Sequence, residues 1–288
     1  MVLEDPRRIR NVALVGHRGS GKTSLAEALL YEAGATDRLG SVDEGTTVCD
    51  SQPDERARRM SISAALAQFR WRGHKINLID TPGEPSFVAD ALAALRVCET
   101  AVFVVNAVMG VEVTTERLWH HAEELGLARL VFVNMLDRER ADFERVLDEL
   151  KERFGAHVVA AEIPIGSEHD FRGVIDLIDM RAFVTTSPER GATREEAIPD
   201  QLRDRAENYR ERLMDEVAEI SDELMERYLE GEEISHDEIV AALEQGVSAG
   251  RIFPVALGAA TRNIGTARLL DALVEDLPSP AEKAPPEQ

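Results

Sequence analysis

The 288-residue sequence predicts an α/β fold, in which a mostly parallel sheet is flanked by helices on both faces. Three observations predict it. Short apolar runs rich in β-branched residues recur along the chain, helical segments follow most of them, and a glycine-rich turn follows the first. Strands that alternate with helices form parallel sheets, because each helix crosses back over the sheet before the next strand begins. We expect six strands, of which only the second is antiparallel.

The first half of the chain supplies most of this pattern. Residues 11–15 predict a buried strand, and the helix after the glycine-rich turn ends at Gly34. Residues 40–60 lack periodicity, which indicates a long irregular loop, and loops of that length are usually functional. Two strand-like runs flank Arg72 and Gly73 and form a hairpin. Further strands at 100–107 and 128–135 are each followed by a helix, at 112–126 and 140–154.

The pattern changes after residue 157, and we interpret 158–251 as an inserted α+β subdomain. It contains the strand-like runs VVAAEIPIGS and VIDLIDMRAFV, then a long helix after Pro199 that breaks or kinks at Ser221. Ser235 and Glu238 form a capping box for another helix. The α/β pattern resumes with a strand at 252–258 and a helix at 264–276. We therefore expect a main domain built from 1–157 and 252–280, with 281–288 as a linker to further domains.

Composition excludes several classes of protein. The net charge is −21, and residues 200–251 hold 16 Asp and Glu against 6 Arg. Such a surface repels nucleic acid phosphate, which argues against sequence-specific DNA binding. It is either a solvated helix face or a contact surface for a basic partner. No apolar run is long enough for a membrane span or signal peptide, and two cysteines suit a reducing compartment, so we expect a cytoplasmic protein.

A phosphate-binding motif lies between the first strand and the first helix. The eight residues match G-x-x-x-x-G-K-[ST], a pattern whose glycines turn backbone N–H groups toward phosphate oxygens at a helix N-terminus. In this motif the lysine reaches the β- and γ-phosphates and the threonine hydroxyl binds Mg²⁺. The expected phosphate-binding residues here are Gly16, His17, Arg18, Gly19, Ser20, Gly21, Lys22, Thr23 and Ser24.

Two further loops follow expected strands of the same sheet. Asp80, Thr81, Pro82 and Gly83 end the third strand, where Asp80 can hold Mg²⁺ through water and the Gly83 N–H can meet a γ-phosphate. This is how a loop distinguishes triphosphate from diphosphate.

The third loop, Asn134-Met135-Leu136-Asp137, ends the fifth strand. An aspartate at that position can accept two hydrogen bonds from guanine, which adenine cannot offer. Asn134 would connect this loop to the phosphate loop. We therefore expect Asp137 to select guanine.

These motifs resemble the translational GTPase family, specifically the G domain of elongation factor G and of elongation factor G-like paralogues. The resemblance covers nearly the whole chain and includes GKTSLAEALLY, DTPGEPSF, FVNMLDRERADF, LMERYLEGEEIS and AGRIFPVALGAATRNIGTARLLDALVEDLPSP. It implies a P-loop NTPase G domain, GTP and GDP, Mg²⁺, the ribosome as partner and further domains. It also implies that the acidic insert contacts the ribosomal stalk protein.

The sequence departs from the family pattern at several sites. Ser61 replaces a threonine, keeps the hydroxyl for Mg²⁺ and is therefore an expected metal ligand beside Thr23. Met135 replaces the lysine that covers the guanine ring, and Gly19 replaces an acid of the phosphate loop. Ala259 and Ala260 replace Ser-Ala in the second base loop, where the Ala260 N–H can still meet guanine O6.

The largest departure is Glu84, because the family has histidine there to orient the attacking water. Phosphoryl transfer depends on positioning and charge stabilisation, and a carboxylate repels the γ-phosphate. At an assumed ~5 Å and an effective dielectric constant of ~20, the repulsion is ~3 kcal/mol, or ~10² in rate. The expected catalytic positions are Glu84, Lys22 and Gly83, and we expect slow hydrolysis.

Three functions stay open at this point. The first is a GTP-hydrolysing translation factor, and the second is a nucleotide-gated regulator of the ribosome with negligible turnover. The third is an ATP-using phosphate-loop enzyme, against which Asp137 argues.

Overall fold

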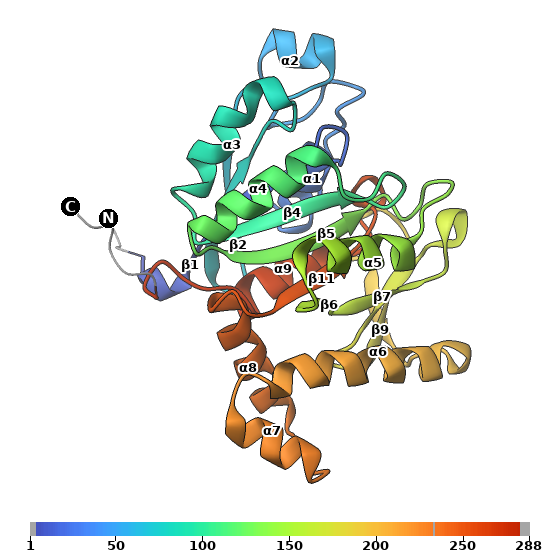
Figure 1. Cartoon of the computed structure of the whole chain (residues 1–288). Helices are drawn as coiled ribbons and strands as arrows, with labels where there is room; N and C mark the ends of the chain where they lie inside the picture. The colour runs from blue at the N-terminus through green and yellow to red at the C-terminus, as the bar shows by residue number, and fades with distance from the viewer. Residues whose placement is uncertain (1–3, 233, 283–288) are drawn as a thin grey trace, which may run out of the picture.

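The computed structural model describes residues 4–232 and 234–282 and arranges them as two sheets with helices packed around them (Figure 1). The main sheet has the order β2-β3-β1-β4-β5-β11-β6. Among its described strands β2 alone runs antiparallel to its neighbour, which confirms the predicted fold class. These strands are β1 (Ile9–Val15), β2 (Ala65–Trp71), β3 (His74–Asp80), β4 (Thr100–Asn106), β5 (Ala128–Asn134), β6 (Val158–Ala160) and β11 (Phe253–Leu257).

The main sheet has seven strands, so the expected count of six was wrong by one. The additional strand is β6, which pairs in parallel with β11 through the Val158–Phe253 register. Its three residues are buried, and Ala161 alone separates them from the first strand of the second sheet. The sequence of VVAAEIPIGS gives no sign that its first part joins one sheet and its second part another. We therefore expected both β6 and β7 to lie in the insert.

Helices cover both faces of the main sheet. Figure 1 shows α4 and α5 in front of it and α9 behind it. Helix α1 packs against α9, and α3 packs against α4. Helix α5 illustrates how local sequence sets the boundaries, because Asp142 accepts the Arg145 N–H at 3.1 Å and Gly155 ends the helix. These helices are α1 (Lys22–Glu32), α3 (Val88–Leu95), α4 (Val113–Glu124), α5 (Phe143–Phe154) and α9 (Thr266–Glu275).

The segment between β6 and β11 forms a second, antiparallel sheet of order β10-β9-β8-β7 and three helices. The break expected at Ser221 is present, since this side chain caps a new helix by accepting the Leu224 N–H at 3.1 Å. The capping box of Ser235 and Glu238 is also present. The elements are β7 (Glu162–Ile165), β8 (Gly173–Asp176), β9 (Arg181–Thr185), β10 (Thr193–Glu196), α6 (Asp200–Ala218), α7 (Asp222–Leu229) and α8 (His236–Ser248).

The 40–60 region is not entirely irregular, because it contains helix α2 (Pro53–Arg58). Gln52 and Glu55 form a capping box at its start, and proline occupies the first helical position. Glu55 is buried although it is charged, and its carboxylate also accepts the N–H groups of Ile62 and Ser63. The helix therefore anchors the chain that leads to Ser61.

Parallel strand order places the functional loops together. Strands β1, β3, β4 and β5 run in the same direction, so their carboxyl ends meet at one edge of the sheet. Asp80 and Asn134 are the last residues of β3 and β5 and are buried at that edge.

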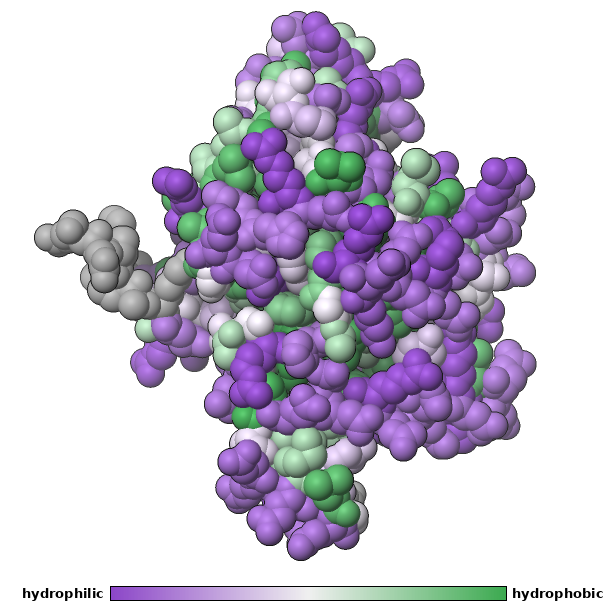
Figure 2. Space-filling model, viewed as in Figure 1, coloured by the Kyte–Doolittle hydropathy of each residue, from purple (hydrophilic) through white to green (hydrophobic). Residues whose placement is uncertain are grey.

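The outer face visible in Figure 2 is mostly hydrophilic, including the region over α6. Within the described residues, none of the helices combines the length and the apolar character that a membrane crossing needs. Of the expected linker at 281–288, only residues 281 and 282 are among those described.

Candidate nucleotide-binding site

The phosphate loop joins β1 to α1 and lies against the base loop. Gly21 has φ +87°, and a Cβ added there would lie 2.4 Å from Asn134 Nδ2. Only glycine fits this backbone conformation and this close approach without strain. Helix α1 begins at Lys22, so its positive end opens on the loop. The predicted strand, turn and helix context of the motif is thus present.

Lys22 is buried in the phosphate loop rather than extended into solvent. Its Nζ donates to the carbonyl oxygens of Gly16 and His17, at 3.0 and 2.9 Å. Burial lowers the pKa of Lys22, while the nearby Asp80 opposes this shift. The ammonium group is therefore held inside the loop, where its charge can meet phosphate.

The His17 side chain contacts the residues at the start of α4. Its ring contacts Thr114 through Nδ1 at 2.9 Å and Glu112 through Nε2 at 3.3 Å, and its backbone N–H donates to Thr115 at 3.3 Å. His17 was expected to bind phosphate, but its side chain is bound to the start of α4. Ser20 is buried in the same loop, and its Oγ has no hydrogen-bond partner among the described residues.

Hydroxyl and carboxylate oxygens gather beside the phosphate loop. Thr23 Oγ1 lies 2.9 Å from Ser61 Oγ, and the Thr23 hydroxyl is close enough to Asp80 to favour its ionised form and lower its pKa. Asp80 Oδ1 is buried and has no partner among the described residues. Burial raises the pKa of Asp80, chiefly because no water solvates its charge. An unpaired buried carboxylate oxygen next to two hydroxyls fits a hard cation, so Thr23 and Ser61 would hold Mg²⁺ and Asp80 would support it.

Asp50 is a residue of this cluster that the sequence analysis missed. It is buried and lines the same cleft. Burial raises the pKa of its carboxyl group, and the nearby Ser61 hydroxyl opposes this. It lies in the aperiodic 40–60 region, where no pattern separates one acid from another.

The loop after β3 lies directly on the phosphate loop. A Cβ added to Gly83 would lie 2.3 Å from Lys22 Nζ and 2.6 Å from the Arg18 backbone nitrogen. Thr81 secures the loop, since its hydroxyl donates to the Leu14 carbonyl at 2.6 Å. Pro82 lies between them and Glu84 follows, with its carboxylate 3.2 Å from the Arg18 guanidinium. Glu84 is therefore one half of an ion pair.

Asn134 joins three loops. Its Nδ2 donates to the Ser20 carbonyl at 3.0 Å, which is the connection to the phosphate loop that the sequence predicts. Its Oδ1 accepts the N–H groups of Met135 and Ala260, at 2.9 and 3.0 Å. The Ala260 N–H, which we expected to face guanine O6, is thus donated to Asn134, because the buried amide oxygen needs donors. Ala259 is buried beside it.

Asp137 provides an acceptor that the protein leaves unused. Its Oδ1 is shielded from solvent and has no hydrogen-bond partner among the described residues. A buried carboxylate oxygen without a donor is costly, unless a ligand supplies one. Met135 lies beside it at φ +67°, with its sulfur 3.3 Å from Asn106 Nδ2.

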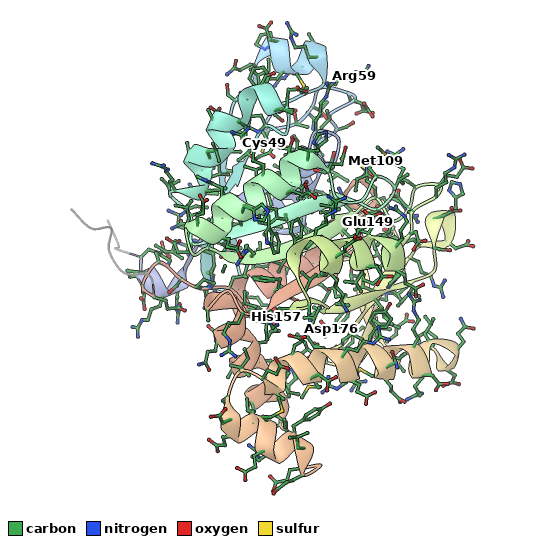
Figure 3. All side chains as sticks on the ribbon, viewed as in Figure 1. Cys49, Arg59, Met109, Glu149, His157 and Asp176 are labelled. Carbon is green, nitrogen blue, oxygen red and sulfur yellow. The ribbon has the colours of Figure 1, made fainter. Side chains whose placement is uncertain are left out.

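These loops surround a cleft of about 520 Å³. Nine of the expected site residues line it: Arg18, Gly19, Gly21, Lys22, Thr23, Ser24, Ser61, Gly83 and Met135. The sequence analysis missed Arg59, Arg138 and Thr261, which also line it. Figure 3 shows Arg59 at the C-terminal end of α2. Arginines in exposed loops have no sequence signal that separates them from ordinary surface charge.

The fold and this site define a phosphate-loop nucleotide-binding protein of the doubly wound α/β class. The protein-family model described as the elongation factor Tu GTP binding domain matches residues 7–279 of this chain. The chain therefore belongs to that family.

Curated relatives support this assignment. Elongation factor G of Thermotoga petrophila is 41% identical over 281 residues, which cover 98% of this chain and 40% of that protein. Elongation factor G of Fervidobacterium nodosum is also 41% identical over 281 residues, with 98% and 41% covered. A crystal structure from Thermus thermophilus has a TM-score of 0.89 and 38% identity, covering 96% of this chain and 41% of that one. This chain thus spans about two fifths of the length of these relatives.

Proposed function

We propose that this chain binds GTP and GDP with Mg²⁺ and hydrolyses GTP as the nucleotide-dependent part of a cytoplasmic factor that acts on the ribosome. One observation carries the proposal. Beside the cleft, two loops each carry a buried carboxylate oxygen that has no partner among the described residues: Asp80 beside the phosphate loop and Asp137 in the base loop. Gly83 of the first loop and Met135 of the second line the cleft, whereas the two aspartates lie behind its lining. Asp80 suits a hydrated cation, and Asp137 suits the two N–H groups of guanine.

Different residues of the chain bind the phosphates, the metal ion and the base. Backbone N–H groups of the phosphate loop and the N-terminus of α1 bind the phosphate oxygens, and the Lys22 ammonium offsets their charge. Mg²⁺, when bound, supplies charge stabilisation across the phosphates. Thr23 and Ser61 would hold the ion, Asp80 would support it through water, and the Gly83 N–H would meet the terminal phosphate. Asp137 selects the base.

Slow hydrolysis is part of the proposal. Glu84 accepts hydrogen bonds, so it can orient water, but it adds negative charge near the phosphate where the family has histidine. The Arg18 guanidinium at 3.2 Å offsets part of that charge. We therefore expect a penalty below the ~10² in rate that an uncompensated carboxylate would impose.

Partner contacts follow from the family and from charge. We propose that the ribosome is the partner and that the acidic segment at 200–251, with 16 Asp and Glu against 6 Arg, meets the ribosomal stalk protein. The alternative is a nucleotide-gated regulator that binds ribosomes with negligible turnover. Single-turnover hydrolysis with and without ribosomes separates the two, because only a GTPase is accelerated by them.

Competition of bound labelled GDP tests the nucleotide class. Unlabelled GTP should displace it at concentrations at which ATP does not. Equal displacement by ATP would favour an ATP-using enzyme.

A further inference from the structure

Arg18 and Glu84 join the two loops that meet at the phosphate end of the cleft. Arg18 Nη1 lies 3.2 Å from Glu84 Oε2, and the two residues are 66 positions apart in the chain. The Arg18 side chain is 59% exposed and the Glu84 side chain 26% exposed. Arg18 lines the cleft, whereas Glu84 approaches it from the loop that carries Gly83.

Two other cationic side chains of the cleft bind groups other than Glu84. Lys22 Nζ donates to the Gly16 and His17 carbonyls, and Arg59, which also lines the cleft, lies 3.8 Å from Asp43. Among the described residues, the Arg18 side chain has Glu84 as its one hydrogen-bond partner. A guanidinium has five N–H donors, so one bond to Glu84 leaves donors for a phosphate oxygen.

We propose that Arg18 is a charge-compensating and positioning residue for the nucleotide site. Its guanidinium neutralises Glu84, so the loop after β3 approaches the terminal phosphate without an uncompensated negative charge. It also ties this loop to the phosphate loop. Because only GTP has a phosphate at that end, the pair should affect triphosphate binding more than diphosphate binding. The inference rests on the proposed function and assigns Arg18 a role in that site.

A double-mutant cycle tests it on the chain described here. The variants are Arg18→Ala, Glu84→Gln and the double variant, and the readout is the Kd of GDP and of a non-hydrolysable GTP analogue, with Mg²⁺. Exposed ion pairs contribute up to about 1 kcal/mol, which corresponds to about fivefold in Kd. We expect Arg18→Ala to weaken analogue binding about tenfold in the wild-type background and about twofold in the Glu84→Gln background. GDP binding should change less than about threefold in either.

Two further variants control the cycle. Arg59→Ala removes another arginine of the same cleft, and its effect should be the same with Glu84 or Gln at position 84. Arg18→Lys keeps the positive charge, so its Kd for the GTP analogue should stay within about twofold of the wild-type value. This variant still tests the need for a positive charge at position 18 if the alanine variant fails to fold.

The outcomes separate this inference from the proposed function. If Arg18→Ala has the same effect in both backgrounds, or weakens GDP as much as the analogue, Arg18 does not compensate Glu84 and the inference is overturned. If the wild-type chain binds neither guanine nucleotide, the proposed function fails first and the inference with it.

Discussion

Thr23 Oγ1 lies 2.9 Å from Ser61 Oγ, although the two residues are 38 positions apart and belong to different segments, the first turn of α1 and the chain after α2. Thr23 is at the start of α1, and the Glu55 carboxylate anchors the residues that follow Ser61 through the Ile62 and Ser63 N–H groups. The two hydroxyls converge beside the unpartnered oxygen of Asp80. This convergence is the structural basis for the proposed cation site.

Removing the Ser61 hydroxyl should weaken nucleotide binding only when Mg²⁺ is present. Loss of one oxygen ligand leaves the ion with a water in its place, and we expect Ser61→Ala to raise the Kd for GDP about tenfold in Mg²⁺. In a chelator the variant and the wild type should bind alike. Ser63→Ala, in the same segment, should behave as wild type in both. An equal loss with and without Mg²⁺ would argue for a role of Ser61 in the fold.

Asp137→Ala should abolish the preference for guanine. Hydrogen bonds to a charged group contribute about 1.5–3 kcal/mol each, so losing two should weaken GDP binding at least about 10²-fold. Phosphate contacts would remain, so guanine and adenine nucleotides should bind the variant with similar weak affinity. Glu139→Gln removes an exposed acid of the same loop and should leave GDP affinity unchanged. A variant that still prefers GDP over ADP would show that another group selects the base.

Glu84→His should speed GTP hydrolysis measured with ribosomes. The change removes a negative charge near the terminal phosphate and adds a group that can orient water. Because Arg18 already offsets part of the charge, we expect about tenfold rather than ~10² in single-turnover rate. In an Arg18→Ala background the gain should be larger. An unchanged rate would mean that Glu84 does not slow the reaction.

Stability should fall as pH rises, because of a buried acid far from the nucleotide cleft. Burial raises the pKa of Glu162 to about 8, and Asp176 and Asp276 add to the shift while the Leu257 N–H and Arg268 oppose it. The folded state therefore binds a proton that the unfolded state has released, between the ordinary glutamate pKa and about 8. The unfolding free energy should decrease over this window by up to about 1.4 kcal/mol per pH unit.

Glu162→Gln tests this dependence with little change in shape. The amide oxygen can still accept the Leu257 N–H, whose bond to Glu162 is 2.9 Å in the wild type. Thermal unfolding from pH 5 to 8.5 should show a flatter profile for this variant, with the largest gain in Tm at the alkaline end. Glu196→Gln, on an exposed strand residue, should keep the wild-type slope. Parallel profiles for all three proteins would place the titrating group elsewhere.

Local sequence patterns predicted most of the fold and most of the cleft. Some features depend only on residues that are close together in the chain, so the sequence predicts them. They are the phosphate-loop glycines, the hairpin at Arg72 and the capping box at Ser235. The short strand β6 was assigned to the wrong sheet because three apolar residues do not specify a partner. The Ala260 N–H was expected to meet guanine O6, whereas it donates to Asn134, a residue 126 positions away in the chain. The Arg18–Glu84 pair is likewise a product of tertiary structure.

Calorimetry of the wild-type chain with GDP and with ADP, each with Mg²⁺, tests the central claim most directly. If two loops bind the magnesium nucleotide and Asp137 selects guanine, GDP should give a saturable binding heat. ADP should give little or no heat at the same concentrations. Equal heats with both nucleotides, or no heat with GDP from folded protein, would contradict the account.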